Sequence, residues 1–152
     1  MRRRIKIYLD TNVYNRPFDD QNQARIRLEA EAFLSILEKT LSGAVSIVSS
    51  SVIAYENSLS PFPDRKERVS GYIAIASRTI KMSDAIKKKA MMLEQAGLDA
   101  LDAMHLACAE FGGAEYFITC DDGVLKKTRG NRSLVSLIVC GPLEFLLEEV
   151  FK

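Results

Sequence analysis

Short apolar segments alternate with helical patterns along the chain, and this alternation constrains the fold more than any other feature of the sequence. Residues 5–9 and 45–48 are short runs of the kind that form buried strands. Residues 25–40 place their apolar side chains at the spacing of one buried helix face. Further strands are expected at 79–82, 116–119 and 134–139, and further helices at 52–57, 64–76, 83–94, 99–111, 122–127 and from 142 onwards. Such alternation is typical of βαβ units, so we expect the α/β class with a parallel sheet wrapped by helices.

The size and composition of the chain suit one ordinary globular domain. Its 152 residues are enough to bury a core, and 47% apolar with 27% charged residues gives no reason to expect disorder. The formal net charge of +1 excludes a uniformly basic nucleic-acid binder but leaves room for local basic patches. No run approaches the roughly 18 apolar residues of a membrane span, and none is long enough for a secretion signal. We therefore expect a single cytoplasmic domain, residues 1–152, that does not act at a membrane.

Acidic residues follow the expected strands at the points where ligands bind in α/β proteins. Asp10 comes directly after the first strand, and Asp121 comes directly after the strand at 116–119. Glu56 lies in the helix that follows the second strand. Open parallel sheets bind their ligands beyond the carboxyl ends of the strands, so these three acids are expected to converge.

Asp102 is a fourth acid, and its surroundings in the sequence are unusual. The expected helix at 98–111 is apolar on nearly every side, which indicates a buried helix with Asp102 in its middle. Burial of a lone carboxylate costs several kcal/mol or more unless it is paired, protonated or bound to a metal. Within one turn, His105 is the only basic residue; a general-base role is conceivable for this single histidine, but a metal mechanism does not require one and we favour a core role. We therefore expect Asp102 to belong to the acidic site.

Several neighbouring polar residues have an ordinary structural interpretation beside a functional one. Asp99 is more readily a helix N-cap than a ligand, and Asp121 or Asp122 can cap the short helix that follows them. Thr119 either contacts a carboxylate or phosphate or simply ends its strand. Asn12 either orients Asp10 or caps the next helix, with a slight preference for the first role.

A cluster of carboxylates without accompanying cysteine or histidine ligands favours Mg²⁺ or Mn²⁺ over zinc. Mg²⁺ keeps several waters and shares ligands with substrate phosphates. This is the arrangement that phosphodiester hydrolysis by a metal-activated water requires.

At four segments the sequence resembles the PIN-domain family. Residues 7–13 read Ile-Tyr-Leu-Asp-Thr-Asn-Val and look like the opening strand and first acid of that family. Residues 50–56 resemble its second segment, in which a serine precedes a helix that carries an acid. Residues 102–107 resemble the third, Asp-Ala with an alanine four residues later, and residues 118–122 resemble the fourth, a strand that ends in Thr-x-Asp. The four segments occur in order and span almost the whole chain.

This resemblance implies a three-layer α/β/α sandwich around a central parallel sheet. It also implies an acidic Mg²⁺ or Mn²⁺ site that cleaves RNA and leaves 5′-phosphate and 3′-hydroxyl ends. The residues implied as metal ligands and catalytic acids are Asp10, Glu56, Asp102 and Asp121. Many small prokaryotic relatives are toxins of toxin–antitoxin pairs, so the resemblance also implies a homodimer and an antitoxin peptide as partners.

Basic residues close to the expected site are candidates for RNA binding. Lys126 and Lys127 follow the fourth acid, and Arg16 follows the first. Such charges could hold phosphates on either side of the cleaved bond, where an acidic pocket alone would repel RNA.

Two other functions compete with the ribonuclease. Asp10-Thr11-Asn12-Val13 resembles the opening of haloacid-dehalogenase phosphatases, whose first aspartate is a nucleophile. That family has a second aspartate where this chain has Asn12, so the general acid would be missing. The other alternative is a non-catalytic PIN-like module that binds RNA or a protein, but a pure binder has no reason to bury Asp102.

Overall fold

A parallel sheet forms the centre of the protein, and the computed structural model describes residues 4–150. Within these residues five strands pair in the order β3-β2-β1-β4-β5. The strands are β1 (Ile5–Leu9), β2 (Val45–Ser50), β3 (Arg78–Ile80), β4 (Tyr116–Ile118) and β5 (Ile138–Cys140). All four pairings are parallel. The expected domain of residues 1–152 extends beyond the described residues at both ends.

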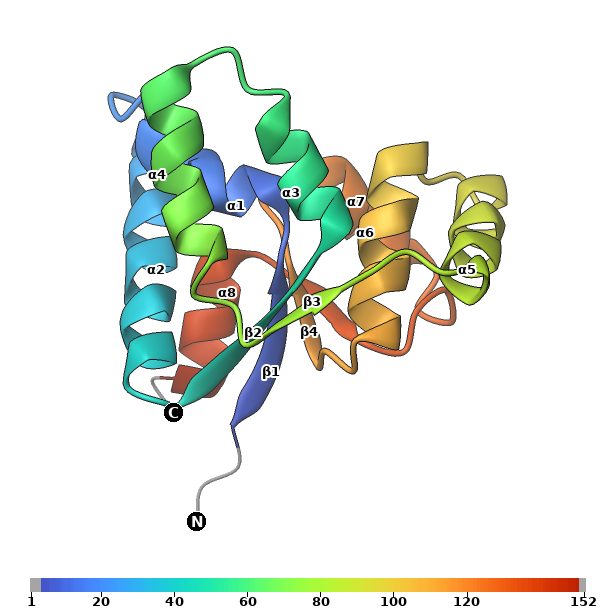
Figure 1. Ribbon diagram of the computed structural model, residues 1–152. Coiled ribbons are helices and arrows are strands. Elements are labelled where there is room, and N and C mark those ends of the chain that lie inside the picture. Colours follow the sequence, from blue (N-terminus) through green and yellow to red (C-terminus); the bar gives the residue numbers. More distant parts are fainter. Residues whose placement is uncertain (1–3, 151–152) are drawn as a thin grey trace.

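Helices cover both faces of this sheet. They are α1 (Thr11–Asn15), α2 (Ala24–Leu41), α3 (Ser51–Ser58), α4 (Pro63–Ile73), α5 (Asp84–Gln95), α6 (Ala100–Phe111), α7 (Asp122–Gly130) and α8 (Pro142–Phe145), with a short 3-10 turn at Arg16–Phe18 and a π-helical turn at Leu146–Val150. Figure 1 shows α2, α4 and α8 on one side of the sheet and α5 and α6 on the other. The predicted α/β/α fold with a central parallel sheet is therefore confirmed. Among residues 4–150 no helix is both long enough and apolar enough to cross a membrane.

The core lies between the central strands and the helices that cover them. Ile7 of β1 pairs in register with Ile47 of β2, and both side chains are fully buried. Phe33 of α2 is also fully buried. The ring of Tyr8 stacks on the ring of Phe117 of β4, with 5.4 Å between their centroids. Burial of a side chain of this size stabilises the fold by about 1.5–3 kcal/mol. The well-packed strands β1 and β4 therefore hold the residues that follow them in fixed positions.

Several expected boundaries were wrong. The last strand begins at Ile138 and not at residue 134, because residues 131–137 form turns and bends. The helix expected at 64–76 runs from Pro63 to Ile73, and Asp64 lies in its first turn, where its negative charge interacts favourably with the helix dipole. Between the strand expected at 5–9 and the helix expected at 25–40, where no element was expected, the structure has α1 and a 3-10 turn at Arg16–Phe18.

Gly112 is a point where the end of α6 approaches the sheet closely. A Cβ atom at Gly112 would lie 2.8 Å from Cγ1 of Val48 and 3.0 Å from Cγ1 of Ile80. We predict that Gly112→Ala lowers the free energy of unfolding by about 1–3 kcal/mol, because branched side chains on two strands would have to move.

Gly71 provides the matched control, because a Cβ there meets nothing within 4 Å and the residue lies inside α4. Gly71→Ala should raise the free energy of unfolding by about 0.5–1 kcal/mol through helix propensity alone. Urea unfolding of both variants tests the pair. Equal effects would contradict the close approach of α6 to the sheet.

Candidate metal and catalytic site

The candidate site lies at the carboxyl ends of β1 and β4, where the order of the strands in the sheet reverses. From β1 the chain continues to β2 and β3 on one side, and it then crosses back to β4 on the other side of β1. Asp10 directly follows β1, and its N–H donates to the carbonyl of Ile118 at 2.9 Å. Thr119 and Asp121 follow β4. Such a switch point is the usual ligand site of an open α/β sheet.

Asp10 is buried and held by three donors. Its Oδ1 accepts from the N–H of Thr11 at 2.8 Å, and its Oδ2 accepts from Oγ1 of Thr119 at 2.8 Å and from Nδ2 of Asn12 at 3.2 Å. Burial raises the pKa of Asp10, whereas His105 and the Thr119 hydroxyl limit the rise. The carboxylate is therefore fixed in orientation but costly to leave charged without a cation.

Thr119 and Asn12 form a polar frame around Asp10. Thr119 is fully buried, and its Oγ1 accepts from the N–H of Asp121 at 3.1 Å. Asn12 also donates to Oγ1 of Thr119 at 3.2 Å, and its Oδ1 accepts from the N–H of Cys120 at 3.0 Å. The sequence left the roles of both residues open, and the structure places both against the first acid.

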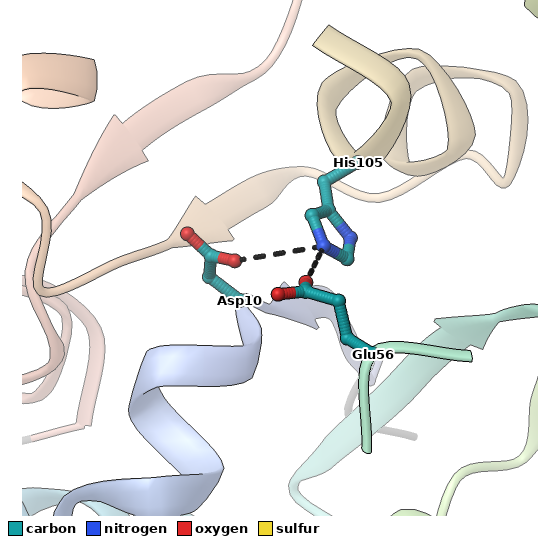
Figure 2. Close-up of side chains that lie close together, drawn as sticks. All are labelled: Asp10, Glu56 and His105. Atoms are coloured by element: carbon teal, nitrogen blue, oxygen red, sulfur yellow. Dashed lines mark hydrogen bonds and ion pairs between the residues drawn. The ribbon is translucent and has the colours of Figure 1, made fainter. Parts of the chain in front are cut away.

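Glu56 of α3 and His105 of α6 meet in front of Asp10. One ligand atom from each of Asp10, Glu56 and His105 lies within 4.8 Å of the other two (Figure 2). Oε1 of Glu56 accepts from Oγ1 of Thr11 at 2.7 Å and forms a short hydrogen bond with Nε2 of His105. Burial raises the pKa of Glu56, but the hydrogen bonds from His105 and Thr11 outweigh it, and the pKa is lowered overall.

His105 lies at the candidate site, although the sequence reasoning favoured a core role for it. It is only 1% exposed, as a core residue would be, but its Nε2 also lies 3.9 Å from Oδ1 of Asp10. The available signal was helical spacing, because His105 lies three residues after Asp102 and therefore shares a face of the helix with it. A single histidine on an apolar background does not show which polar groups other elements bring to it.

Asp102 differs from the expectation of a deeply buried residue in the middle of a helix. Because α6 begins at Ala100, Asp102 lies in its first turn and is half-buried. Burial and the nearby charges of Asp10, Asp121 and Asp99 raise the pKa of Asp102 to about 6. The charges of Asp10 and Asp121 therefore act on Asp102, but within the described residues the close cluster of ligand atoms consists of Asp10, Glu56 and His105 and includes neither Asp102 nor Asp121.

The remaining acids fall into different environments. Asp121 caps α7, since its Oδ1 accepts from the N–H of Gly123 at 2.7 Å and of Val124 at 3.3 Å. Asp122 is exposed and pairs with Arg25 at 2.8 Å. Asp99 occupies the N-cap position of α6, but its side chain makes no capping hydrogen bond. Of the adjacent pair, Asp121 is the acid that acts on Asp102, which favours it over Asp122 as a site residue.

The three basic candidates for RNA binding differ in whether acidic side chains already pair with them. Arg16 forms ion pairs with Asp19 at 3.0 Å and Glu29 at 3.1 Å. Lys126 and Lys127 are exposed on α7, the helix that Asp121 caps. The two lysines are therefore better placed than Arg16 to contact a phosphate.

The donor set suits a hard divalent cation. Within residues 4–150, no lysine or arginine forms an ion pair with Asp10, Glu56, Asp102 or Asp121. Carboxylates that repel one another in a partly buried position are stabilised by a cation, and oxygen ligands of this kind are those that Mg²⁺ and Mn²⁺ take.

Comparison with known proteins agrees with this architecture. The family model described as "PIN domain" matches residues 7–131, a range that contains all four acids of the candidate site. The chain therefore belongs to the PIN-domain family.

Two solved structures share the fold at low sequence identity. VapBC2 from Rickettsia felis, bound to a DNA fragment from its promoter, matches with a TM-score of 0.60 and 18% identity over 89% of this chain and 97% of that chain. FitAcB from Neisseria gonorrhoeae matches with a TM-score of 0.58 and 16% identity over 90% of this chain and 98% of that chain. No curated protein matches the sequence significantly.

Proposed function

We propose that this protein is a metal-dependent endoribonuclease, a hydrolase of RNA phosphodiester bonds. The observation that carries the proposal is the convergence of Asp10 and Glu56 at the switch point of the sheet, with the charge of Asp10 acting on Asp102. Membership of the PIN-domain family supports the same reaction class. The activity is proposed for a single PIN-like domain in the cytoplasm.

Asp10, Glu56, Asp102 and Asp121 are the residues that would hold Mg²⁺ or Mn²⁺. The bound ion would supply an activated water as nucleophile and would neutralise charge on the phosphate. The chain itself orients the ligands, because Thr119 and Asn12 fix Asp10 while Thr11 fixes Glu56. Lys126 and Lys127 would hold the RNA backbone beside an otherwise repulsive acidic pocket.

A role as the toxin of a toxin–antitoxin pair extends this proposal. It is supported by the family resemblance and by the similarity of the fold to VapBC2 and FitAcB. The expected partners are an antitoxin peptide that silences the site and a second copy of the chain. Co-expression with the product of a neighbouring short gene, followed by size-exclusion chromatography, tests both partners.

Cleavage of end-labelled single-stranded RNA tests the proposed reaction. We predict cleavage with Mg²⁺ or Mn²⁺, none with EDTA, and products with 5′-phosphate and 3′-hydroxyl ends. Glu56→Gln should lower the rate at least a hundredfold, because it replaces a charged ligand with a neutral amide. A rate that survives both EDTA and Glu56→Gln would point to a contaminating nuclease, and a protein that binds RNA without cutting it would support the non-catalytic alternative.

A further inference from the structure

A chain of buried hydrogen bonds runs from β2 to the candidate site. Oγ of Ser50 lies 2.6 Å from the hydroxyl of Tyr8, and this hydroxyl lies 2.7 Å from Nδ1 of His105. Nε2 of His105 then bonds to Glu56. Ser50, Tyr8 and His105 are at most 1% exposed. Four different elements (β2, β1, α6 and α3) therefore contribute to one continuous chain.

The Glu56 carboxylate fixes the direction of the bond at Nε2, and the neutral tautomer of His105 then gives the directions of the others. The Glu56 carboxylate can only accept, so Nε2 of His105 carries the proton and donates it. In the tautomer that has its single N–H on Nε2, Nδ1 is the acceptor for the Tyr8 hydroxyl. The Tyr8 oxygen in turn accepts from Ser50. In this arrangement every polar atom of the chain has a partner, which a dry interior requires.

We infer that His105 is a positioning residue for Glu56, and that Tyr8 and Ser50 hold its proton on Nε2; the inference rests on the proposed function. His105 and Thr11 both bond to Oε1 of Glu56. Within the described residues, Oε2 of Glu56 accepts no hydrogen bond and remains free for a ligand. Figure 2 shows the carboxyl groups of Asp10 and Glu56 lying next to the imidazole.

Two other roles for His105 make different predictions. If His105 were itself a metal ligand, Nε2 would have to give up its proton and its bond to Glu56 when the ion binds. If His105 were only a core residue, any side chain of similar volume would serve. Partners that orient a metal ligand from behind usually contribute 10–100-fold in metal affinity or activity, so the three roles are separable.

Nitrogen NMR of the untagged protein tests the position of the proton. The chain contains one histidine, so the imidazole gives a single set of signals. We expect a proton on Nε2 and an accepting Nδ1, both without metal and with diamagnetic Mg²⁺. Tyr8→Phe should shift the Nδ1 signal, whereas the control Tyr14→Phe should not, because Tyr14 is equally buried but makes no hydrogen bond to His105. A proton on Nδ1, or loss of the Nε2 proton on addition of Mg²⁺, would overturn the inference.

Substitution of His105 tests the positioning of Glu56. We expect His105→Leu to weaken Mn²⁺ binding, measured by calorimetry, at least about tenfold, and to lower kcat on RNA by a similar factor. His105→Gln keeps an N–H donor toward Glu56 and should recover most of both losses. Equal Mn²⁺ affinity in His105→Leu and wild type would show that His105 does not position Glu56. If His105→Leu does not fold, the Tyr8→Phe protein provides the same comparison.

These experiments also separate the inference from the proposed function. A wild-type protein that binds Mn²⁺ through this arrangement but leaves RNA intact would reject the ribonuclease and support the positioning role. A wild-type protein that cuts RNA at the same rate as His105→Leu would support the ribonuclease and reject the positioning role. A protein that neither binds Mn²⁺ nor cuts RNA would reject both.

Discussion

Asp102→Asn should abolish metal-dependent RNA cleavage and leave the metal-free fold at least as stable as wild type. The amide keeps the shape of the side chain but removes one charge that Asp10, Asp121 and Asp99 repel. We expect a loss of at least about a thousandfold in rate, which corresponds to about 4 kcal/mol of transition-state stabilisation. The free energy of unfolding of the metal-free variant should rise by about 1 kcal/mol at neutral pH, because half-burial leaves part of the repulsion screened.

The gain in the free energy of unfolding on Asp102→Asn should depend on pH. The pKa of Asp102 is raised to about 6 from an ordinary value of 3.8. The folded protein therefore holds its proton more tightly than the unfolded chain, so this residue lowers stability as pH rises between these two values. The gain from Asp102→Asn should be absent below the ordinary pKa and fully developed above pH 6. Urea unfolding of both proteins across this range measures it.

Asp84→Asn is the matched control, because Asp84 lies in the first turn of α5 as Asp102 does in α6 and is exposed. The Asp84→Asn protein should cleave RNA at the wild-type rate. Its free energy of unfolding should fall by about 0.3–1 kcal/mol, because the favourable interaction of the Asp84 charge with the helix dipole is lost. Mn²⁺ at a hundredfold excess over its Kd should stabilise wild type by about 2.7 kcal/mol and should stabilise Asp102→Asn less. Normal cleavage by Asp102→Asn would shift the assignment to Asp99.

Thr119→Val should be the most destabilising of the near-isosteric changes at the site. The hydroxyl donates to Asp10 and accepts from Asn12 and from the N–H of Asp121. Valine has the same shape but leaves a buried carboxylate and two donors with fewer partners. We expect a loss of about 2–3 kcal/mol in the free energy of unfolding, because the penalty for one unpaired buried group is about 1–3 kcal/mol.

Thr128→Val is the control for this change. Thr128 is similarly buried, but its hydroxyl donates only to the carbonyls of Val124 and Leu125 within α7. Its loss should cost about 1 kcal/mol or less, because a typical hydrogen bond contributes only about 0.5–1.5 kcal/mol net. Thr119→Ser should keep most of the stability that Thr119→Val loses. Equal losses in Thr119→Val and Thr128→Val would mean that the hydroxyl of Thr119 does not organise the acidic site.

The sequence predicted the strands and helices well where their signals are local. A parallel sheet with buried strands follows from short apolar runs, and Asp10 at the end of such a run must lie at the carboxyl edge of the sheet. Residues 134–137 were misplaced as part of a strand because an apolar run does not show whether neighbouring strands extend far enough to pair with it. Tertiary pairing decides that: β4 begins only at Tyr116, which pairs with Ile138, so the residues before Ile138 have no strand beside them.

The candidate site was predictable in its acids but not in the groups that hold them. Asp102 was expected to be deeply buried because its helix is apolar on most sides, yet the helix starts only two residues earlier and leaves that turn partly open. The contact between His105 and Glu56 joins α6 to α3, and the contact between Tyr8 and His105 joins β1 to α6. Such contacts depend on how elements pack, which no local pattern of residues specifies.

Anomalous diffraction from crystals grown with Mn²⁺ tests the central claim most directly. We predict an anomalous peak beside the carboxyl groups of Asp10 and Asp102 in wild type, and a weaker peak or none in Asp102→Asn crystals at the same Mn²⁺ concentration. A peak at another part of the surface, or no peak at a concentration that supports RNA cleavage, would contradict the proposal that these carboxylates form a metal-dependent nuclease site.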